Sequence, residues 1–247
     1  MGSAGCAYFI AGTDTEIGKT LIASSVLYAL TQTGCRTAGL KPVAAGAELR
    51  DGVWHNEDAD ALAEQASVTL PTALTTPYLF RQPTAPHIAA AQEGRAIDLP
   101  HILACYRQIA QRAEAVVVEG VGGFRVPLTQ AVDTADLAQE LGLPVILVVG
   151  LRLGCISHAL LTVEAIAARG LQLAGWVANT VDVGLLNSDA TVDALASRIA
   201  SPLLGRVPRL CAASHPGQTQ ASAAARYLDF SSLPGWPAAM AHVADAG

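Results

Sequence analysis

The sequence is poor in charged and in aromatic residues. Asp, Glu, Lys and Arg make up 15% of its 247 residues and Phe, Trp and Tyr 5%, whereas 51% are hydrophobic and the mean hydropathy is +0.37. A chain this apolar, with a net charge of −6, is not disordered over most of its length. We also expect no membrane span, because the most apolar stretch, 143–153, is broken by Pro144, Gly150 and Arg152 and falls short of the ~18 apolar residues required.

The chain also lacks basic clusters, cysteine pairs and a recognisable leader. Its 15 basic residues are scattered, which argues against nucleic acid as a partner, since phosphate binding needs grouped Lys and Arg. No charged segment followed by an apolar run opens the chain, so we expect no secretory signal. The cysteines form no CxxC pair, which favours reduced thiols in a cytoplasmic protein over a zinc site or a disulfide framework. They are Cys6, Cys35, Cys105, Cys155 and Cys211.

Short apolar runs alternate with Ala- and Leu-rich segments of helical period. The runs predict strands over 7–11, 37–43, 115–119, 144–149, 173–178 and 203–207. The segments between them predict helices over 19–31, 102–112, 135–141, 158–168 and 189–199. Continuous apolar strands separated by helices predict an α/β fold with a parallel sheet covered by helices on both faces.

Two parts of the chain are less regular. Residues 51–92 contain four prolines, and we expect them to cross the carboxyl edge of the sheet, where such folds bind their ligands. Residues 235–247 are rich in Ala, so we predict a loose tail there, after a single domain over residues 1–234.

The segment GTDTEIGKT, residues 12–20, joins the first predicted strand to the first predicted helix. A glycine-bearing loop before a helix offers backbone N–H groups and the positive end of the helix dipole to a phosphate. In such a P-loop, Lys19 would reach the β- and γ-phosphates and the Thr20 hydroxyl would hold Mg²⁺. Gly12 stands one residue further from Gly18 than in the usual pattern, and the alternative is a chance GKT at a tight turn. The flanking strand and helix favour a P-loop NTPase-like nucleotide site.

Two carboxylates are candidates for the same metal, because Mg²⁺ takes one or two carboxylates beside phosphate oxygens. Glu119 ends an apolar strand and is followed by the glycine-rich segment 120–123, which is the position of a Walker-B acid. Asp58 lies in NEDAD, residues 56–60, where it would either ligate the metal or, like Asn56, cap a helix. The pattern leaves both possibilities for Asp58 open.

Lysine occurs only twice in the chain, at Lys19 and Lys41. Lys41 closes a predicted apolar strand, where a buried lysine is costly without an anionic partner. The alternative is a lysine that reaches solvent at the rim of the sheet. Because both lysines fall beside the proposed site, we favour a cation that meets a phosphate or a carboxylate-like group.

Eight segments resemble, in order, those of the dethiobiotin synthetase family. They are GTDTEIGKT (12–20), RTAGLKPVAAG (36–46), NEDA (56–59), PTAPHIAAAQEGR (83–95), VEGVGG (118–123), PVILVVGLRLGCISHALLT (144–162), GWVAN (175–179) and PLLGRVP (202–208). The phosphate loop with its extra residue is shared with a wider group that includes cobyrinic acid amide-forming enzymes. The KPVA, PHIAAAQEG and LGCISHA segments are more specific to the synthetase.

The resemblance implies an ATP-dependent ligase reaction. CO₂ forms a carbamate on one amine of 7,8-diaminopelargonic acid, the γ-phosphoryl group of MgATP is transferred to it, and the second amine closes a cyclic urea, which releases ADP and phosphate. The resemblance implies Lys19 and Lys41 as catalytic cations, and Thr20, Asp58 and Glu119 as Mg²⁺ ligands. It implies further contacts to ATP from Glu16, Ile17, Gly18, Leu21, Gly120, Val121, Gly122, Asn179, Thr180, Pro208, Arg209 and Leu210. It implies substrate contacts from Thr15, Lys41, Ala45, Gly122 and Ser157.

Two of these positions depart from the family. Ala45 stands where a serine usually contacts the substrate, so one hydrogen bond worth about 0.5–1.5 kcal/mol is expected to be missing. Ser157 stands where Asn is common. The resemblance also implies a homodimer, in which the segment that contains Ser157, LGCISHA (153–159), closes the partner's pocket around the carboxylate tail of the substrate.

Three other interpretations agree less well with the sequence. Nucleotide-switch ATPases that position chromosomes or division sites carry an additional lysine early in the loop, but here Thr13 and Asp14 occupy that part. Amide formation on a corrinoid usually comes with a glutaminase domain, for which 247 residues leave no room. A nucleotide-binding module without catalysis would not need Lys19, Lys41 and Glu119.

Overall fold

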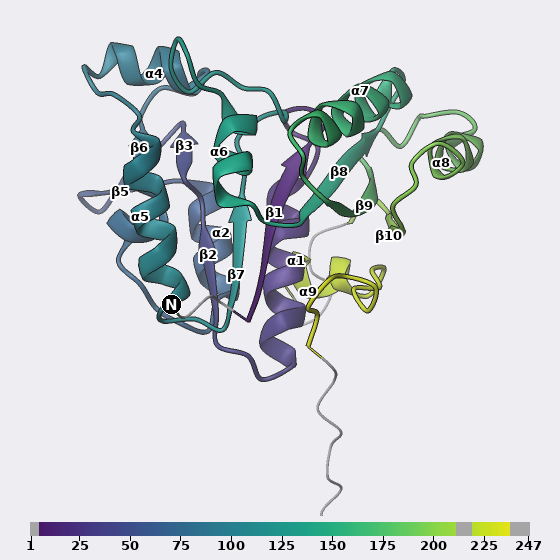
Figure 1. The fold of residues 1–247 in the computed structure, drawn as a ribbon, viewed down its shortest axis with the longest axis horizontal. Helices are drawn as coiled ribbons and strands as arrows, with labels where there is room; N and C mark the ends of the chain where they lie inside the picture. Colours follow the sequence, from purple (N-terminus) through teal and green to yellow (C-terminus); the bar gives the residue numbers. More distant parts are fainter. Residues whose placement is uncertain (1–4, 211–218, 238–247) are drawn as a thin grey trace, which may run out of the picture.

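A six-stranded sheet forms the centre of the molecule, and all of its strands are parallel (Figure 1). The computed structural model describes residues 5–210 and 219–237. In the order in which they lie across the sheet, the strands are β10 (Leu203–Val207), β9 (Leu173–Thr180), β8 (Val145–Leu151), β1 (Cys6–Gly12), β7 (Ala115–Glu119) and β2 (Thr37–Leu40). Their carboxyl ends therefore meet at one edge, with the end of β7 beside that of the central strand β1.

Helices cover both faces of this sheet, which confirms the predicted fold class. One face carries α1 (Lys19–Gln32), α2 (Glu57–Gln65) and α9 (Gln220–Ala225). The other carries α5 (Leu99–Ala110), α6 (Thr134–Leu141), α7 (Cys155–Ala168) and α8 (Ser188–Ala196). Along β1, Tyr8 and Ile10 pack toward the first face, whereas Phe9 and Ala11 pack toward the second. Both faces of the inner strands are buried, which explains their apolar runs without polar alternation, whereas the edge strand β10 is buried in part.

The predicted strand over 37–43 is wrong in its extent, because the chain leaves the central sheet after Leu40. The backbone N–H of Lys41 donates to Thr75 O at 2.8 Å, away from β7, and Pro42 has no N–H to continue a ladder. A separate short strand, β3 (Val43–Ala45), begins directly afterwards. This bend places Lys41 at the carboxyl edge of the sheet.

Part of the proline-rich region forms a small layer at that edge (Figure 1), whereas α2, from the same predicted range of 51–92, packs on a face of the sheet. There β3 pairs in parallel with β6 (Tyr78–Phe80), and an antiparallel hairpin joins β4 (Glu48–Arg50) to β5 (Val53–His55). Two short helices complete the layer, α3 (Thr72–Thr75) and α4 (Pro86–Gln92). Side chains of β3, β6 and α4 make a separate apolar cluster together with residues of α5 and α6.

Near the start of the predicted tail, Trp236 packs against the rest of the chain. The ring of Trp236 stacks on Phe230 at 4.7 Å and on Tyr8 at 6.1 Å between centroids. The Tyr8 hydroxyl donates to Pro234 O at 2.9 Å. The remaining part of the predicted tail, 238–247, lies outside the described residues.

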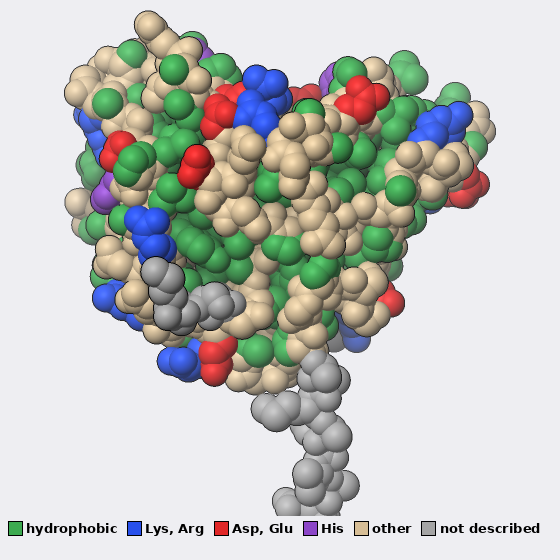
Figure 2. Space-filling view, viewed as in Figure 1, with side chains coloured by type: hydrophobic (Ala, Val, Ile, Leu, Met, Phe, Trp, Pro, Cys, Tyr) green, Lys and Arg blue, Asp and Glu red, His purple; other side chains and the backbone are tan. Residues whose placement is uncertain are grey.

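Charged side chains are few on the face seen in Figure 2 and lie mainly around its rim. In the ranges 5–210 and 219–237, no helix combines the length and the apolar character needed to cross a membrane. The high apolar fraction of the sequence is instead accounted for by the two apolar clusters that fill the space between the sheet and its helices.

Candidate active site

The phosphate loop leads from β1 into α1 and leaves the N-terminus of that helix open. Gly18 precedes α1 with φ of 88°, and a Cβ at this position would lie 2.2 Å from Asn179 Nδ2, so the position requires glycine. No side chain caps α1, and its first turn holds no acidic residue. Free N–H groups and the positive end of the helix dipole therefore face the loop, as an anion site requires.

Lys19 lies in the first turn of α1 and is 7% exposed. Its ammonium donates to the carbonyl of Asp14 at 2.8 Å, which folds the side chain back along the loop. Burial, reinforced by the nearby Lys41, lowers the pKa of Lys19 to about 8. A phosphate in the loop would supply a negative charge and favour the ammonium form.

A cluster of one lysine, two carboxylates and a hydroxyl lies beside this loop, with the lysine and one carboxylate buried and the other two side chains half-buried. Lys41 Nζ is 2.7 Å from Glu119 Oε1, 2.8 Å from Asp58 Oδ2 and 3.2 Å from Gly120 O. The Thr20 hydroxyl is 2.5 Å from Asp58 Oδ1 and 2.8 Å from Glu119 Oε1. Four segments supply the cluster: the bend after β2 supplies Lys41, the start of α1 supplies the hydroxyl, and the end of β7 and the first turn of α2 supply the carboxylates.

The helix cap at α2 is Asn56, whose side chain accepts from the N–H groups of Asp58 and Ala59. Asp58 is therefore not the cap. Its carboxylate points instead toward Thr20 and Lys41, which removes the alternative that the sequence left open.

The cluster is electrostatically coupled. Burial by itself would lower the pKa of Lys41, but the carboxylates of Glu119 and Asp58 outweigh it, so that its pKa is raised. Burial acts against the ionised form of Asp58 as well, yet Lys41 and Thr20 hold its pKa below the ordinary value. Glu119 is 0% exposed, and this burial raises its pKa although Lys41 opposes the shift.

The loop and the cluster open into one cavity of about 740 Å³. Eleven of the implied site residues line it: Thr15, Glu16, Gly18, Lys19, Thr20, Lys41, Ala45, Asp58, Glu119, Val121 and Gly122. The opposite wall comes from residues to which the sequence analysis gave no role, namely Ala44, Pro83, Thr84, Ala85, Pro86 and Val126. The proline-rich run 83–86 was the available signal, since it lies in a segment that resembles the synthetase family.

Other implied residues lie around this cavity rather than in it. Asn179 is 5% exposed and donates through Nδ2 to Ile17 O at 2.8 Å, so the two residues meet beneath the loop. The carbonyl of Gly120 accepts from Lys41. Leu21 lines a separate cavity of about 500 Å³ between α1, α2 and α9.

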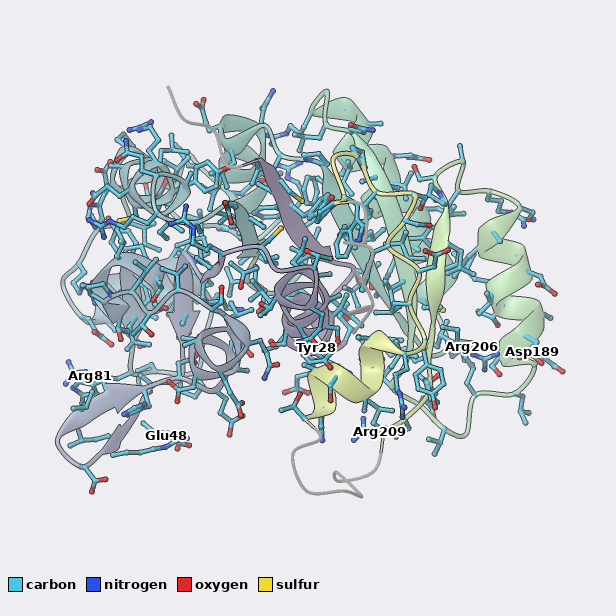
Figure 3. All side chains as sticks on the ribbon, turned by 90° about the horizontal axis from the view of Figure 1, so that it is seen from below. Tyr28, Glu48, Arg81, Asp189, Arg206 and Arg209 are labelled. Carbon is cyan, nitrogen blue, oxygen red and sulfur yellow. The ribbon has the colours of Figure 1, made fainter. Side chains whose placement is uncertain are left out.

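The implied base-binding residues lie at the carboxyl ends of β9 and β10. Thr180, Pro208 and Arg209 line a cavity of about 440 Å³, together with Tyr227 and with Arg206, which pairs with Asp189 (Figure 3). Leu210 packs against the apolar cluster between the sheet and α1. The adenine contact implied for this set stays a prediction.

Ser157 is not part of any cavity described above. It lies in the first turn of α7, is exposed, and belongs to the segment that follows β8. The structure therefore does not bring it together with the other implied substrate residues of the same chain.

The phosphate loop lies at the end of the central strand and is followed by Lys and Thr, and it faces an acid at the end of the neighbouring strand. This arrangement defines a P-loop NTPase-like protein. A ParA family ATPase from Chlorobium tepidum TLS has this fold, with a TM-score of 0.56, 15% identity and coverage of 90% of this chain and 97% of that one. The septum site-determining protein MinD from Pyrococcus horikoshii OT3, complexed with Mg-ADP, gives a TM-score of 0.53, 17% identity and coverage of 89% and 92%. At these identities the likeness shows the fold alone.

Sequence comparison is more specific. The family described as "AAA domain" matches residues 6–216. An ATP-dependent dethiobiotin synthetase from Janthinobacterium sp. (strain Marseille) is 61% identical over 235 residues, which cover 94% of this chain and 97% of that protein. The chain belongs to the dethiobiotin synthetase family, and the resemblance stated from its motifs is confirmed.

Proposed function

We propose that this chain closes a cyclic urea on 7,8-diaminopelargonic acid, with CO₂ as the carbon source and ATP as the energy source, to give dethiobiotin. The observation that carries the proposal is the buried Lys41 with its two carboxylates in the cavity that contains the phosphate loop. The 61% identity to a curated synthetase supports the same reaction.

The reaction has three bond-forming steps. One amine of the substrate adds to CO₂ and gives a carbamate. A carbamate oxygen attacks the γ-phosphorus of ATP, ADP leaves, and a mixed carbamic–phosphoric anhydride remains. The second amine attacks the carbamoyl carbon and closes the five-membered ring as phosphate departs. The protein has little covalent chemistry to perform, so it acts by positioning and by stabilising charge.

Lys19 and Lys41 are the two cations of this site. Lys19 lies at the phosphate loop and would stabilise the β- and γ-phosphates, while Lys41 lines the same cavity and would meet the carbamate and the γ-phosphate. Amines attack only when unprotonated, and nearby positive charge disfavours their ammonium form. The two lysines therefore stabilise anionic groups and keep the substrate amines reactive.

The donor set fits Mg²⁺, which we propose is held by Thr20, Asp58 and Glu119. Within the part of the chain that the structure describes, Glu119 Oε2 is buried and has no hydrogen-bond partner, so one carboxylate oxygen is left for a ligand. Two carboxylates and a hydroxyl leave further positions for phosphate oxygens, as Mg²⁺ sites usually do. The ion would supply positive charge at the β- and γ-phosphate oxygens.

The substrate occupies the part of the cavity between Thr15, Ala45 and Gly122 and the wall of residues 83–86. Because Ala45 has no hydroxyl, we expect substrate binding to be weaker by about 0.5–1.5 kcal/mol than with serine. The Ala45→Ser variant should lower KM for the diamine and leave KM for ATP unchanged.

We also propose a homodimer in which α7 and the loop before α8 face the partner. Four large apolar side chains are exposed in α7, just before it and in the loop before α8, where a partner would cover them. They are Leu153 (93%), Leu161 (61%), Val183 (78%) and Leu186 (84%). Ser157 lies in the same region, and we propose, on the family resemblance, that it reaches the pocket of the partner. Leu161→Asp should convert a dimer into a monomer in light scattering, and an unchanged mass would exclude this surface.

The decisive assay follows the incorporation of ¹⁴C-labelled CO₂ into an acid-stable product with the diamine and MgATP. Incorporation that depends on both co-substrates supports the proposal, and ATP hydrolysis without incorporation would favour a nucleotide-switch ATPase. We place the reaction in the cytoplasm, where ATP is available, and fractionation of cells that contain the tagged chain tests this.

A further inference from the structure

The ammonium of Lys41 occupies the space between the two carboxylates that are assigned to the metal. It is 2.8 Å from Asp58 Oδ2 and 2.7 Å from Glu119 Oε1, and the carbonyl of Gly120 completes its surroundings at 3.2 Å. A lysine ammonium has three N–H donors, and three oxygen atoms surround this one. At 2% exposure, it has little access to the cavity that it lines.

Without this cation the two carboxylates would repel each other. Thr20 Oγ1 lies within hydrogen-bond distance of both, but its single proton reaches only one carboxylate at a time. Two negative charges that meet in a buried site repel each other strongly. The positive charge of Lys41 therefore does for Asp58 and Glu119 what a divalent ion would do.

We propose that Lys41 is a stand-in for the metal, and that Mg²⁺ exchanges with its ammonium and releases it toward the substrate. The inference rests on the proposed function, because it assigns Mg²⁺ to Thr20, Asp58 and Glu119. A divalent ion and an ammonium cannot both contact Glu119, which is buried, and Asp58, which is half-buried, without strong repulsion between the two cations. Lys41 lines the main cavity with Ala44 and Ala45, so the released ammonium would have the substrate region before it.

The exchange orders events in the site. Before Mg²⁺ arrives, Lys41 is held by Asp58 and Glu119 and cannot stabilise a carbamate. After the exchange, the same ammonium is free for the carbamate and the γ-phosphate. The site thus becomes competent for the substrate only when the metal is present.

The same residues allow a rival arrangement, in which the metal binds Thr20 and the free Oε2 of Glu119 and Lys41 stays between the carboxylates.

The scarcity of lysine makes a direct test practical. In a Lys19→Arg chain, Lys41 is the single lysine, so reductive methylation followed by peptide mass spectrometry reports on its ammonium alone. The rate is measured with ADP and EDTA, and with ADP and Mg²⁺, since ADP brings no γ-phosphate to cover Lys41. Nα-acetyl-lysine in the same tube serves as the reference for the reagent.

We expect methylation of Lys41 to become several-fold faster with Mg²⁺, whereas the reference is unchanged. An equal rate in both conditions would mean that Lys41 stays between the carboxylates, and would overturn the inference. Neither result depends on turnover. Failure of CO₂ fixation with a Mg²⁺-dependent labelling rate would therefore remove the proposed reaction and leave the exchange.

A second variant measures the competition from the side of the metal. Lys41→Met keeps an unbranched side chain that is one atom shorter and removes its charge. The free carboxylates should therefore bind Mg²⁺ about tenfold more tightly than in the wild type, as calorimetry without nucleotide would measure. The same change should make the melting temperature depend more steeply on Mg²⁺. Equal or weaker Mg²⁺ binding would contradict the exchange. If this variant is recovered only as aggregate, the labelling rate decides the question alone.

Discussion

The lowered pKa of Lys19 predicts that nucleotide affinity falls in mildly alkaline solution. Burial and the neighbouring Lys41 bring this pKa to about 8, from an ordinary value of 10.5. A phosphate binds the ammonium form much better than the neutral amine. If only the ammonium form binds, the affinity for ADP at about pH 9 should be about tenfold lower than at about pH 7.

The fall of nucleotide affinity with rising pH can be told apart from a loss of folding, because the two quantities change in opposite directions. For the free protein, a folded-state pKa below the unfolded value means that stability increases as the pH rises from about 8 toward 10.5. Nucleotide affinity should fall over the lower part of the same range. A loss of affinity that is accompanied by a gain in melting temperature therefore cannot be attributed to alkaline unfolding.

The assay is calorimetric titration with Mg-ADP across this pH range in two buffers of different ionisation enthalpy. At about pH 8 the complex should take up about half a proton per nucleotide bound, because the phosphates raise the pKa of Lys19 again. Lys19→Arg is the matched control, since a guanidinium keeps its charge throughout, and its affinity should stay nearly constant. A wild-type affinity as constant as that of the variant would refute the reasoning that a Lys19 with a lowered pKa binds the phosphates as an ammonium.

Three further changes probe other parts of the argument. Lys41→Ala should keep the binding of ADP but abolish formation of the cyclic urea, measured as ¹⁴C incorporation, and product at the wild-type rate would remove Lys41 from the mechanism. Gly18→Ala should abolish nucleotide binding, because its Cβ would lie 2.2 Å from the amide of Asn179. The control is Gly94→Ala, which is also at positive φ but has no atom within 4 Å of the added Cβ. It should cost about 1 kcal/mol of stability and leave nucleotide binding intact. Trp236→Ala should lower the free energy of unfolding, measured by urea denaturation, by about 2 kcal/mol, which is less than the loss of a fully buried Trp would cost. An unchanged free energy of unfolding would show that the stacking of this ring contributes nothing to stability.

The central sheet was predictable from the sequence because strands buried on both faces leave long apolar runs. The strand over 115–119 and the last one over 203–207 have the predicted bounds. The division of the segment 37–43 was not predicted, because its apolar pattern continues through the bend. What ends β2 is a long-range contact, the hydrogen bond from the N–H of Lys41 to Thr75 O, for which the local sequence has no signature.

The candidate site was predictable where a motif joins two elements and uncertain where distant side chains meet. The P-loop pattern located Lys19 and Thr20, but it could not decide whether Asp58 is a cap or a ligand. That question depends on the position of α2 relative to α1 and β7, which follows from packing across the sheet. The role of residues 83–86 as a cavity wall was missed for the same reason, since an apolar, proline-rich loop carries no chemical signal of its own.

The central position of β1 has a consequence for how the chain is made. Cys6 pairs with Ala115 and Phe9 with Val145, so the first strand of the sheet has no partner on either side until roughly 110 to 140 more residues have been synthesised. At about 5–20 residues per second, β1 and the loop after it wait from several seconds to about half a minute on the ribosome. During that time a strongly apolar strand has two unpaired edges, which makes the nascent N-terminal part a candidate for chaperone binding and for aggregation when expression is fast.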